Sequence, residues 1–133
     1  MNLECFGPAA RFHHVGIAVS AIRDILPACR PTYDPIQKVN VALVLLNGLR
    51  LELIEPAGED TPISLSLKKG IKYLHVCFEV DDVNAVLRRS RQYGFHLIRQ
   101  PAPAVAFDKR RVAFVFSRAF VLIELLEGTI AHQ

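Results

Sequence analysis

The side chains best suited to chemistry in this chain are two histidines and two glutamates that occupy matching places in two similar stretches. They are His14 and Glu52 in the first stretch and His75 and Glu124 in the second. Imidazole nitrogens and carboxylate oxygens bind divalent first-row metals at roughly 2.0–2.2 Å, and four protein ligands leave positions for substrate oxygens on an ion that prefers six. We therefore predict one divalent metal ion at these four residues. The donor set does not distinguish Co, Mn, Ni, Zn and Mg.

The glutamates carry more weight in this prediction than the histidines. A single histidine in a strand is usually a structural residue with satisfied hydrogen bonds. Glu124, in contrast, lies within the apolar run Val-Leu-Ile-Glu-Leu-Leu, where burying an unpaired carboxylate is costly. It needs a metal, an arginine partner or solvent. Because Glu52 occupies the matching place in the other stretch, the repeat favours the metal.

Both histidines lie in runs with apolar residues at every second position, which is typical of strands with two differently used faces. The two runs are residues 12–19 and 73–80. In the first run His14 shares its face with Gly16 and Ala18, and in the second run His75 shares its face with Cys77. A small residue two positions after each histidine leaves room above the imidazole.

The strongest local signal is Asn47-Gly48 between two β-rich runs, residues 39–46 and 49–54. This pair favours a two-residue type I′ hairpin, because both turn residues need a positive φ. The turn predicts a register in which Leu46 faces Leu49, Leu45 faces Arg50, and Leu43 faces Glu52. Arg50, Val41 and Leu43 then share the side of Glu52, and we predict that they contact the substrate. Arg50 has two open roles, pairing with Glu52 or binding an anion.

The remaining elements complete two halves that each run strand, helix, strands. We expect a short helix capped by Ser20 that ends near Cys29, because Pro27 and Pro31 limit it. A second helix follows Asp81 or Asp82, with Tyr93 facing inward and Gly94 as its C-cap. The other expected elements are an irregular segment or brief edge strand at 31–37, a helical turn at 62–69, strands at 95–99, 111–116 and 120–126, and a loop at 101–103.

Composition indicates a cytoplasmic globular protein. The 133 residues are 51% apolar with a net charge of +3, and three cysteines without framework spacing suggest reduced thiols. No apolar run approaches the ~20 residues of a membrane span, and the first residues do not form a signal peptide. Three short basic groups are either solvated surfaces or contacts for an anionic substrate tail. They are not interleaved with aromatic residues, which argues against nucleic acid.

Four segments of the chain together resemble the vicinal oxygen chelate (glyoxalase/bleomycin resistance) superfamily, and most of all its methylmalonyl-CoA epimerase-like branch. They are residues 13–19, 51–56, 75–82 and 122–125, and residues 107–114 resemble epimerase-like members as well. The resemblance implies an α+β fold in which two tandem βαβββ modules form a curved, partly open mixed sheet around a metal cleft. We expect a single domain, 1–133, with module one at about 10–58 and module two at about 70–128.

The resemblance also implies an activity. Such a protein would be a metal-dependent isomerase (epimerase) or lyase (glyoxalase-like) that stabilises the enolate of a small carbonyl or CoA-thioester substrate, and a homodimer. Glu124 would be catalytic as well as a metal ligand. Bacterial-type epimerases carry a second acid/base carboxylate on the strand before Glu52, where this chain has Val41. The alternative is a non-catalytic member that sequesters a small apolar or antibiotic-like ligand.

Overall fold

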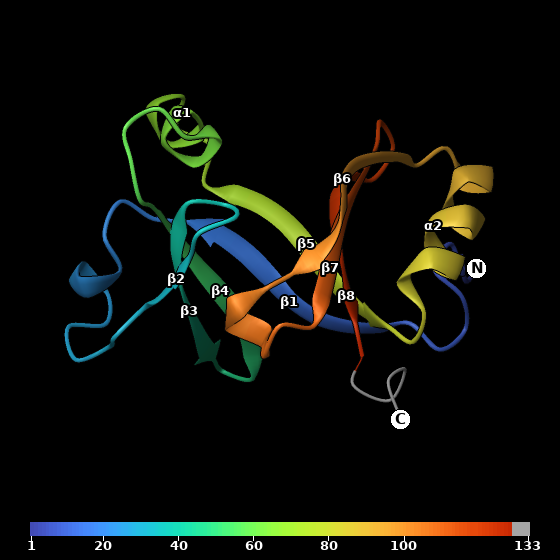
Figure 1. Cartoon of the computed structure of the whole chain (residues 1–133), viewed down its shortest axis with the longest axis horizontal. Helices are drawn as coiled ribbons and strands as arrows, with labels where there is room; N and C mark the ends of the chain where they lie inside the picture. Colours follow the sequence, from blue (N-terminus) through green and yellow to red (C-terminus); the bar gives the residue numbers. More distant parts are fainter. Residues whose placement is uncertain (129–133) are drawn as a thin grey trace. The chain divides into compact units, whose positions relative to one another are not determined.

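The structure, a computed structural model, describes residues 1–128 of the chain. Figure 1 shows the order of the elements along the sequence. The strands are β1 (Arg11–Ala18), β2 (Thr32–Asp34), β3 (Val39–Leu46), β4 (Leu49–Pro56), β5 (Tyr73–Val80), β6 (His96–Pro103), β7 (Arg111–Ser117) and β8 (Val121–Glu127). The helices are α1 (Pro62–Lys68) and α2 (Val83–Ser90), with 3-10 turns η1 (Ile22–Asp24), η2 (Arg91–Tyr93) and η3 (Val105–Phe107).

The chain forms two compact units. The β1–β4 unit consists of His14–Leu74 together with Val105–Asp108. Among the described residues, the β5–β8 unit consists of Met1–His13, His75–Ala104 and residues 109–128. The short segment Val105–Asp108 is therefore notable, since it lies between β6 and β7 in the sequence but packs with the β1–β4 unit.

The sheet of the β1–β4 unit has the order β2-β3-β4-β1. β1 and β4 are parallel, while β3 is antiparallel to both of its neighbours. The predicted hairpin register is confirmed, with Leu46 opposite Leu49, Leu45 opposite Arg50 and Leu43 opposite Glu52. Asn47 and Gly48 have φ of 48° and 88°, the two positive values that a type I′ turn requires. The brief edge strand expected in residues 31–37 is β2.

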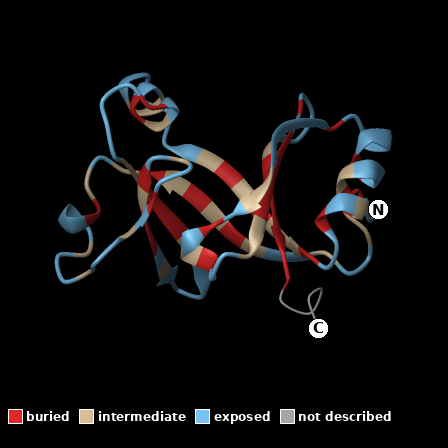
Figure 2. Ribbon diagram, in the orientation of Figure 1, coloured by how far each residue is buried: buried red, intermediate tan, exposed pale blue. Residues whose placement is uncertain are grey.

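The apolar side chains of this unit pack on both faces of its sheet. Ile22, Ala42 and Leu53 form one buried cluster. Another cluster contains Val39, Val41 and Ile54, with Ala106 of η3 packed against it. Figure 2 shows the resulting alternation along β1, where buried and half-buried positions follow one another.

The stunted or distorted helix expected between Ser20 and Cys29 is shorter than predicted, and its predicted cap is wrong. Only the 3-10 turn η1 forms there, preceded by Ala21, without a side-chain cap from Ser20. Pro27 has no N–H to donate and its ring clashes with the preceding turn, so a regular helix cannot continue through it. The backbone N–H of Ile22 instead donates to Glu55 Oε1 at 2.8 Å.

The sheet of the β5–β8 unit has the order β5-β8-β7-β6, with β5 parallel to β8 and the other neighbours antiparallel. α2 contacts β6, β7 and β8, and its buried Val83 and Val86 join the core cluster of this unit (Figure 1). Asp82 caps α2 as predicted, accepting the backbone N–H of Ala85 at 3.2 Å.

Two details of this unit differ from the sequence expectations. Tyr93 was expected inside but is 42% exposed, because the helix tightens into a 3-10 turn after Ser90 and the side-chain phase changes. Strand β6 continues through residues 101–103, which were expected to form a loop. Proline is compatible with an edge strand, where no neighbouring strand needs its missing N–H. Gly94, with φ of 85°, is the predicted C-cap.

The predicted fold class is confirmed. Each half of the chain runs strand, helical turn or helix, and three strands, so the protein is α+β with two tandem βαβββ modules and mixed sheets. The predicted module boundaries, about 10–58 and 70–128, remain predictions. Among residues 1–128, no helix combines the length and the apolar character needed to cross a membrane.

Candidate metal centre

The first candidate pair, His14 and Glu52, is positioned by the parallel pairing of β1 and β4. Glu52 is the register partner of Gly16, two residues after His14. Because side chains two apart in a strand point the same way, His14 and Glu52 lie on one face of the sheet. Their atoms Nε2 and Oε1 are 3.6 Å apart. His14 is fully buried and Glu52 is 5% exposed.

The second pair, His75 and Glu124, repeats this arrangement on β5 and β8. Glu124 is the register partner of Cys77, two residues after His75. The distance from His75 Nε2 to Glu124 Oε1 is 3.2 Å, and both side chains are buried. The repeat in the sequence is therefore also a repeat in the structure. In both units the glutamate lies on the neighbouring parallel strand, opposite the residue two positions after the histidine.

Each histidine also contacts a phenylalanine. The ring of Phe107 stacks on His14, with centroids 5.5 Å apart and an interplanar angle of 16°. Phe114 meets His75 edge-on, with centroids 5.5 Å apart at 80°. The lone pair of an imidazole nitrogen lies in the ring plane, so a ring stacked on the face leaves that direction open. The sequence analysis missed both contacts, because no local pattern links residues so far apart in the chain.

The donor set of each pair suits a divalent metal. Each supplies one imidazole nitrogen and one carboxylate oxygen, the ligand types of Zn²⁺, Mn²⁺ and Co²⁺ sites. Burial adds to this, because a carboxylate removed from water needs a compensating positive charge or hydrogen bonds. The residues present therefore fit a metal.

The predicted substrate residues lie on the face of the β1–β4 sheet that carries Glu52. Leu43 is opposite Glu52 and 44% exposed, while Val41 is opposite Ile54 and 6% exposed. Both line a cavity of about 160 Å³ that is also lined by Arg30 and by other residues of the same unit, Cys29, Thr32, Ala42 and Ala106. Arg50 is exposed and lies opposite Leu45.

Three further glutamates near these pairs have structural partners. Glu55 accepts hydrogen bonds from the Ile22 N–H and, at 2.9 Å, from the Asn40 amide, so it acts as a capping residue. Glu79 pairs with Arg110 at 2.6 Å, and this hydrogen bond lowers the pKa of the Glu79 carboxyl.

Glu127 accepts two hydrogen bonds from Arg111, both at 2.9 Å, and one from the N–H of Val83 at the start of α2. The hydrogen bonds to Glu127 raise the pKa of the Arg111 guanidinium. Glu127 and Glu124 thus occupy the same strand with different roles, one fixing a helix and the other facing a histidine.

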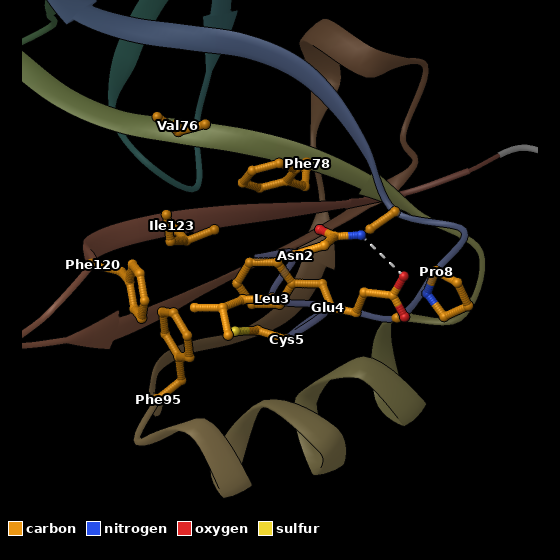
Figure 3. Close-up of a pocket in the computed structure, with 13 residues that line it drawn as sticks. Asn2, Leu3, Glu4, Cys5, Pro8, Val76, Phe78, Phe95, Phe120 and Ile123 are labelled. Atoms are coloured by element: carbon orange, nitrogen blue, oxygen red, sulfur yellow. Dashed lines mark hydrogen bonds between the residues drawn. The ribbon is translucent and has the colours of Figure 1, made fainter.

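An apolar pocket lies on the other face of the β5–β8 sheet. It has a volume of about 390 Å³ and is lined by residues of the amino-terminal segment, such as Leu3 and Cys5, together with Phe78 and Phe95 (Figure 3). The ring of Phe6, which also lines it, lies 5.5 Å from that of Phe78 and 5.1 Å from that of Phe95. Val76 and Ile123 in its wall alternate along their strands with His75 and Glu124. The pocket therefore does not belong to the candidate metal centre.

Comparisons with known proteins agree on one family. Residues 13–114 match the model of the Glyoxalase/Bleomycin resistance protein/Dioxygenase superfamily. An ethylmalonyl-CoA/methylmalonyl-CoA epimerase of Cereibacter sphaeroides is 29% identical over 130 residues, which cover 86% of this chain and 96% of that protein. The uncharacterized protein YqjC of Bacillus subtilis is 32% identical, covering 88% of this chain and 91% of that protein. The crystal structure of methylmalonyl-CoA epimerase from Mycobacterium tuberculosis is 26% identical, with a TM-score of 0.71, covering 89% of this chain and 87% of that one.

Proposed function

Because the chain belongs to the glyoxalase/bleomycin resistance protein/dioxygenase superfamily, we propose that it is a metal-dependent enzyme of the methylmalonyl-CoA epimerase/glyoxalase type. Its substrate is a small carbonyl compound or a CoA thioester, and its reaction passes through an enolate. The observation that carries the proposal is the buried His–Glu pair found at the same strand register in both units.

In this proposal the two pairs bind one divalent ion, with His14, Glu52, His75 and Glu124 as ligands. The single domain, 1–133, then holds one ligand pair on each of its two modules. An ion bound there supplies Lewis-acid stabilisation for the negative charge that develops on the substrate oxygens. The choice among Co, Mn, Ni, Zn and Mg is left to measurement.

Glu124 is the proposed acid/base residue. One oxygen of its carboxylate takes the proton from the substrate carbon next to the carbonyl, while the electron pair of the broken C–H bond moves into the enolate. The same oxygen then returns the proton. While the proton is held on the Glu124 carboxyl it can exchange with the solvent, so a deuteron can return to the substrate carbon in its place.

The substrate is proposed to lie along the face that carries Glu52. Val41 and Leu43 contact its apolar part in the cavity of about 160 Å³, where Arg30 adds a positive charge. Arg50, exposed further along the same face, contacts an anionic group such as the phosphates of a carrier. Val41 offers no proton to the opposite side of the substrate, so proton exchange is expected to be more efficient than inversion.

The test is proton exchange in deuterated water. Purified, metal-loaded protein is incubated with methylmalonyl-CoA, and deuterium at the α-carbon is followed by mass spectrometry, with lactoylglutathione formation from methylglyoxal and glutathione as a second assay. Wild type should exchange the proton, Glu124→Gln should not, and Glu127→Gln in the same strand should behave as wild type. Absence of both activities in metal-loaded wild type would contradict the proposal.

A binding protein is the second candidate, and the apolar wall favours it. Val39, Val41 and Ile54 form a buried apolar cluster on this face, with Leu43 exposed beside it. Such a wall suits sequestration of a small apolar or antibiotic-like ligand without catalysis. Calorimetry with a set of apolar ligands separates the two cases, because a binder gives saturable heat without turnover in either assay.

The proposal includes a cytoplasmic homodimer. The resemblance to the epimerase branch supports the homodimer. The three cysteines, Cys5, Cys29 and Cys77, support the cytoplasm, because none of them forms a disulfide. Light scattering coupled to gel filtration measures the assembly directly.

A further inference from the structure

Phe107, from outside β1–β4, stacks on His14, the histidine of the β1–β4 unit. It lies in η3, between β6 and β7, and is 5% exposed. Its ring is nearly parallel to the His14 imidazole, at 16° and 5.5 Å. Neighbouring Ala106 packs against the cluster of Val39, Val41 and Ile54, so two adjacent residues of η3 are inserted into the β1–β4 unit.

The backbone around Phe107 holds it in this place. The Ala104 N–H donates to the Arg110 carbonyl at 3.0 Å, and the Lys109 N–H donates to the Ala104 carbonyl at 2.9 Å, which closes the base of the loop. Asp108 and Lys109 follow with φ of 54° and 64°. Two consecutive non-glycine residues in the left-handed region cost about 1 kcal/mol or more each, and such strain persists only where surrounding contacts hold it.

Two ion pairs fix the chain directly after this strained turn. Arg110 pairs with Glu79 at 2.6 Å, and the next residue, Arg111, forms the two hydrogen bonds to Glu127. The loop is thus anchored at its exit to β5 and β8.

We propose that Phe107 is a positioning residue for His14, and that metal binding and the docking of η3 favour each other. This inference rests on the proposed metal centre. A parallel ring on one face of the imidazole restricts its rotation and excludes water from that face, while the in-plane nitrogen lone pairs stay available for the ion. Because coupling between two binding events is reciprocal, an ion that needs His14 in this orientation also stabilises the docked loop.

Phe107→Leu tests the need for a ring, because leucine keeps an apolar side chain in the site but has no flat surface. Outer contacts of a metal-ligating histidine typically change metal affinity about 10–100-fold when removed. We expect a loss in this range for Phe107→Leu by chelator competition, together with an altered visible spectrum of the Co²⁺-loaded protein. Phe107→Tyr should restore both, and Val105→Ala, at an exposed position of the same turn, should change neither.

Limited proteolysis tests the reciprocal effect without any activity. Trypsin cleaves after Lys109, which is exposed in the turn that follows Phe107. Saturating metal should slow this cleavage by at least about fivefold in wild type and much less in Phe107→Leu. Circular dichroism melts confirm that each variant is folded.

The two proposals fail in different ways. If wild type binds no divalent ion, both the proposed function and this inference are rejected. If wild type binds the ion but Phe107→Leu has the same affinity, spectrum and cleavage rate, only the role of Phe107 is rejected. An affinity loss in Phe107→Leu that Phe107→Tyr does not restore would show that a ring at this position is not sufficient, and would also reject the role of Phe107.

Discussion

Replacing Glu124 with leucine should leave the metal-free protein at least as stable as wild type and remove its stabilisation by a divalent ion. Glu124 is 2% exposed and lies 3.2 Å from His75 Nε2. Replacing a buried carboxylate with an apolar residue of similar size removes the cost of keeping its charge away from water. Leucine fills most of the volume of the Glu124 side chain, so the apo protein should keep its fold.

The size of the metal effect follows from linkage. An ion present at 100 times its dissociation constant, and bound only by the folded state, stabilises the protein by about 2.7 kcal/mol. A chain of 133 residues lies between the size classes for which 1 kcal/mol shifts the melting temperature by about 2–4 °C and about 4–8 °C. Wild type should therefore melt about 10 °C higher with metal than without, and Glu124→Leu should show almost no shift.

Glu127→Leu is the matched control, three residues further along β8. It removes the three hydrogen bonds from Arg111 and Val83, and should destabilise the fold by about 2–3 kcal/mol. Its metal-dependent shift should nevertheless equal that of wild type. The metal role of Glu124 is refuted if Glu124→Leu keeps the full shift, and the metal centre itself is refuted if wild type shows none in differential scanning calorimetry.

Three further outcomes are expected. The hydrogen bond from Arg110 holds the pKa of the Glu79 carboxyl below its unfolded value of 4.5. The pair therefore stabilises the fold above pH 4.5, and this contribution is lost as the pH falls through the folded pKa. In urea titrations the difference in free energy of unfolding between wild type and Glu79→Gln should vanish in acid. Leu125→Ala, at a fully buried core position, should cost about 2–5 kcal/mol in the same titrations without changing metal affinity. Arg50→Leu should raise the KM for a CoA thioester several-fold with little change in kcat, and an unchanged KM would remove Arg50 from the substrate site.

The sequence carries enough information for the hairpin and for both His–Glu pairs. Asn47-Gly48 specifies one turn type, that turn specifies the register, and the register determines which side chains lie beside Glu52. The repeat then transfers the same placement to Glu124, whose apolar neighbours already indicate an unusual environment. These are local or periodic signals, which a single sequence retains.

Two of the failures depend on contacts between residues that are distant in the sequence. The helix expected after Ser20 is replaced by a turn whose N–H is capped by Glu55, thirty-three residues away. Phe107 was assigned only to a segment of family resemblance, because nothing nearby in the sequence indicates that a ring between β6 and β7 stacks on His14. Long-range packing of this kind leaves no periodic pattern.

The most direct measurement is X-ray absorption spectroscopy of the zinc-loaded protein, which counts imidazole ligands at the metal. One ion bound by both His–Glu pairs should show two imidazoles among nitrogen and oxygen ligands at about 2.0–2.2 Å, and His14→Ala and His75→Ala should each leave one. A single imidazole in wild type, or a count unchanged by either substitution, would contradict a shared metal centre.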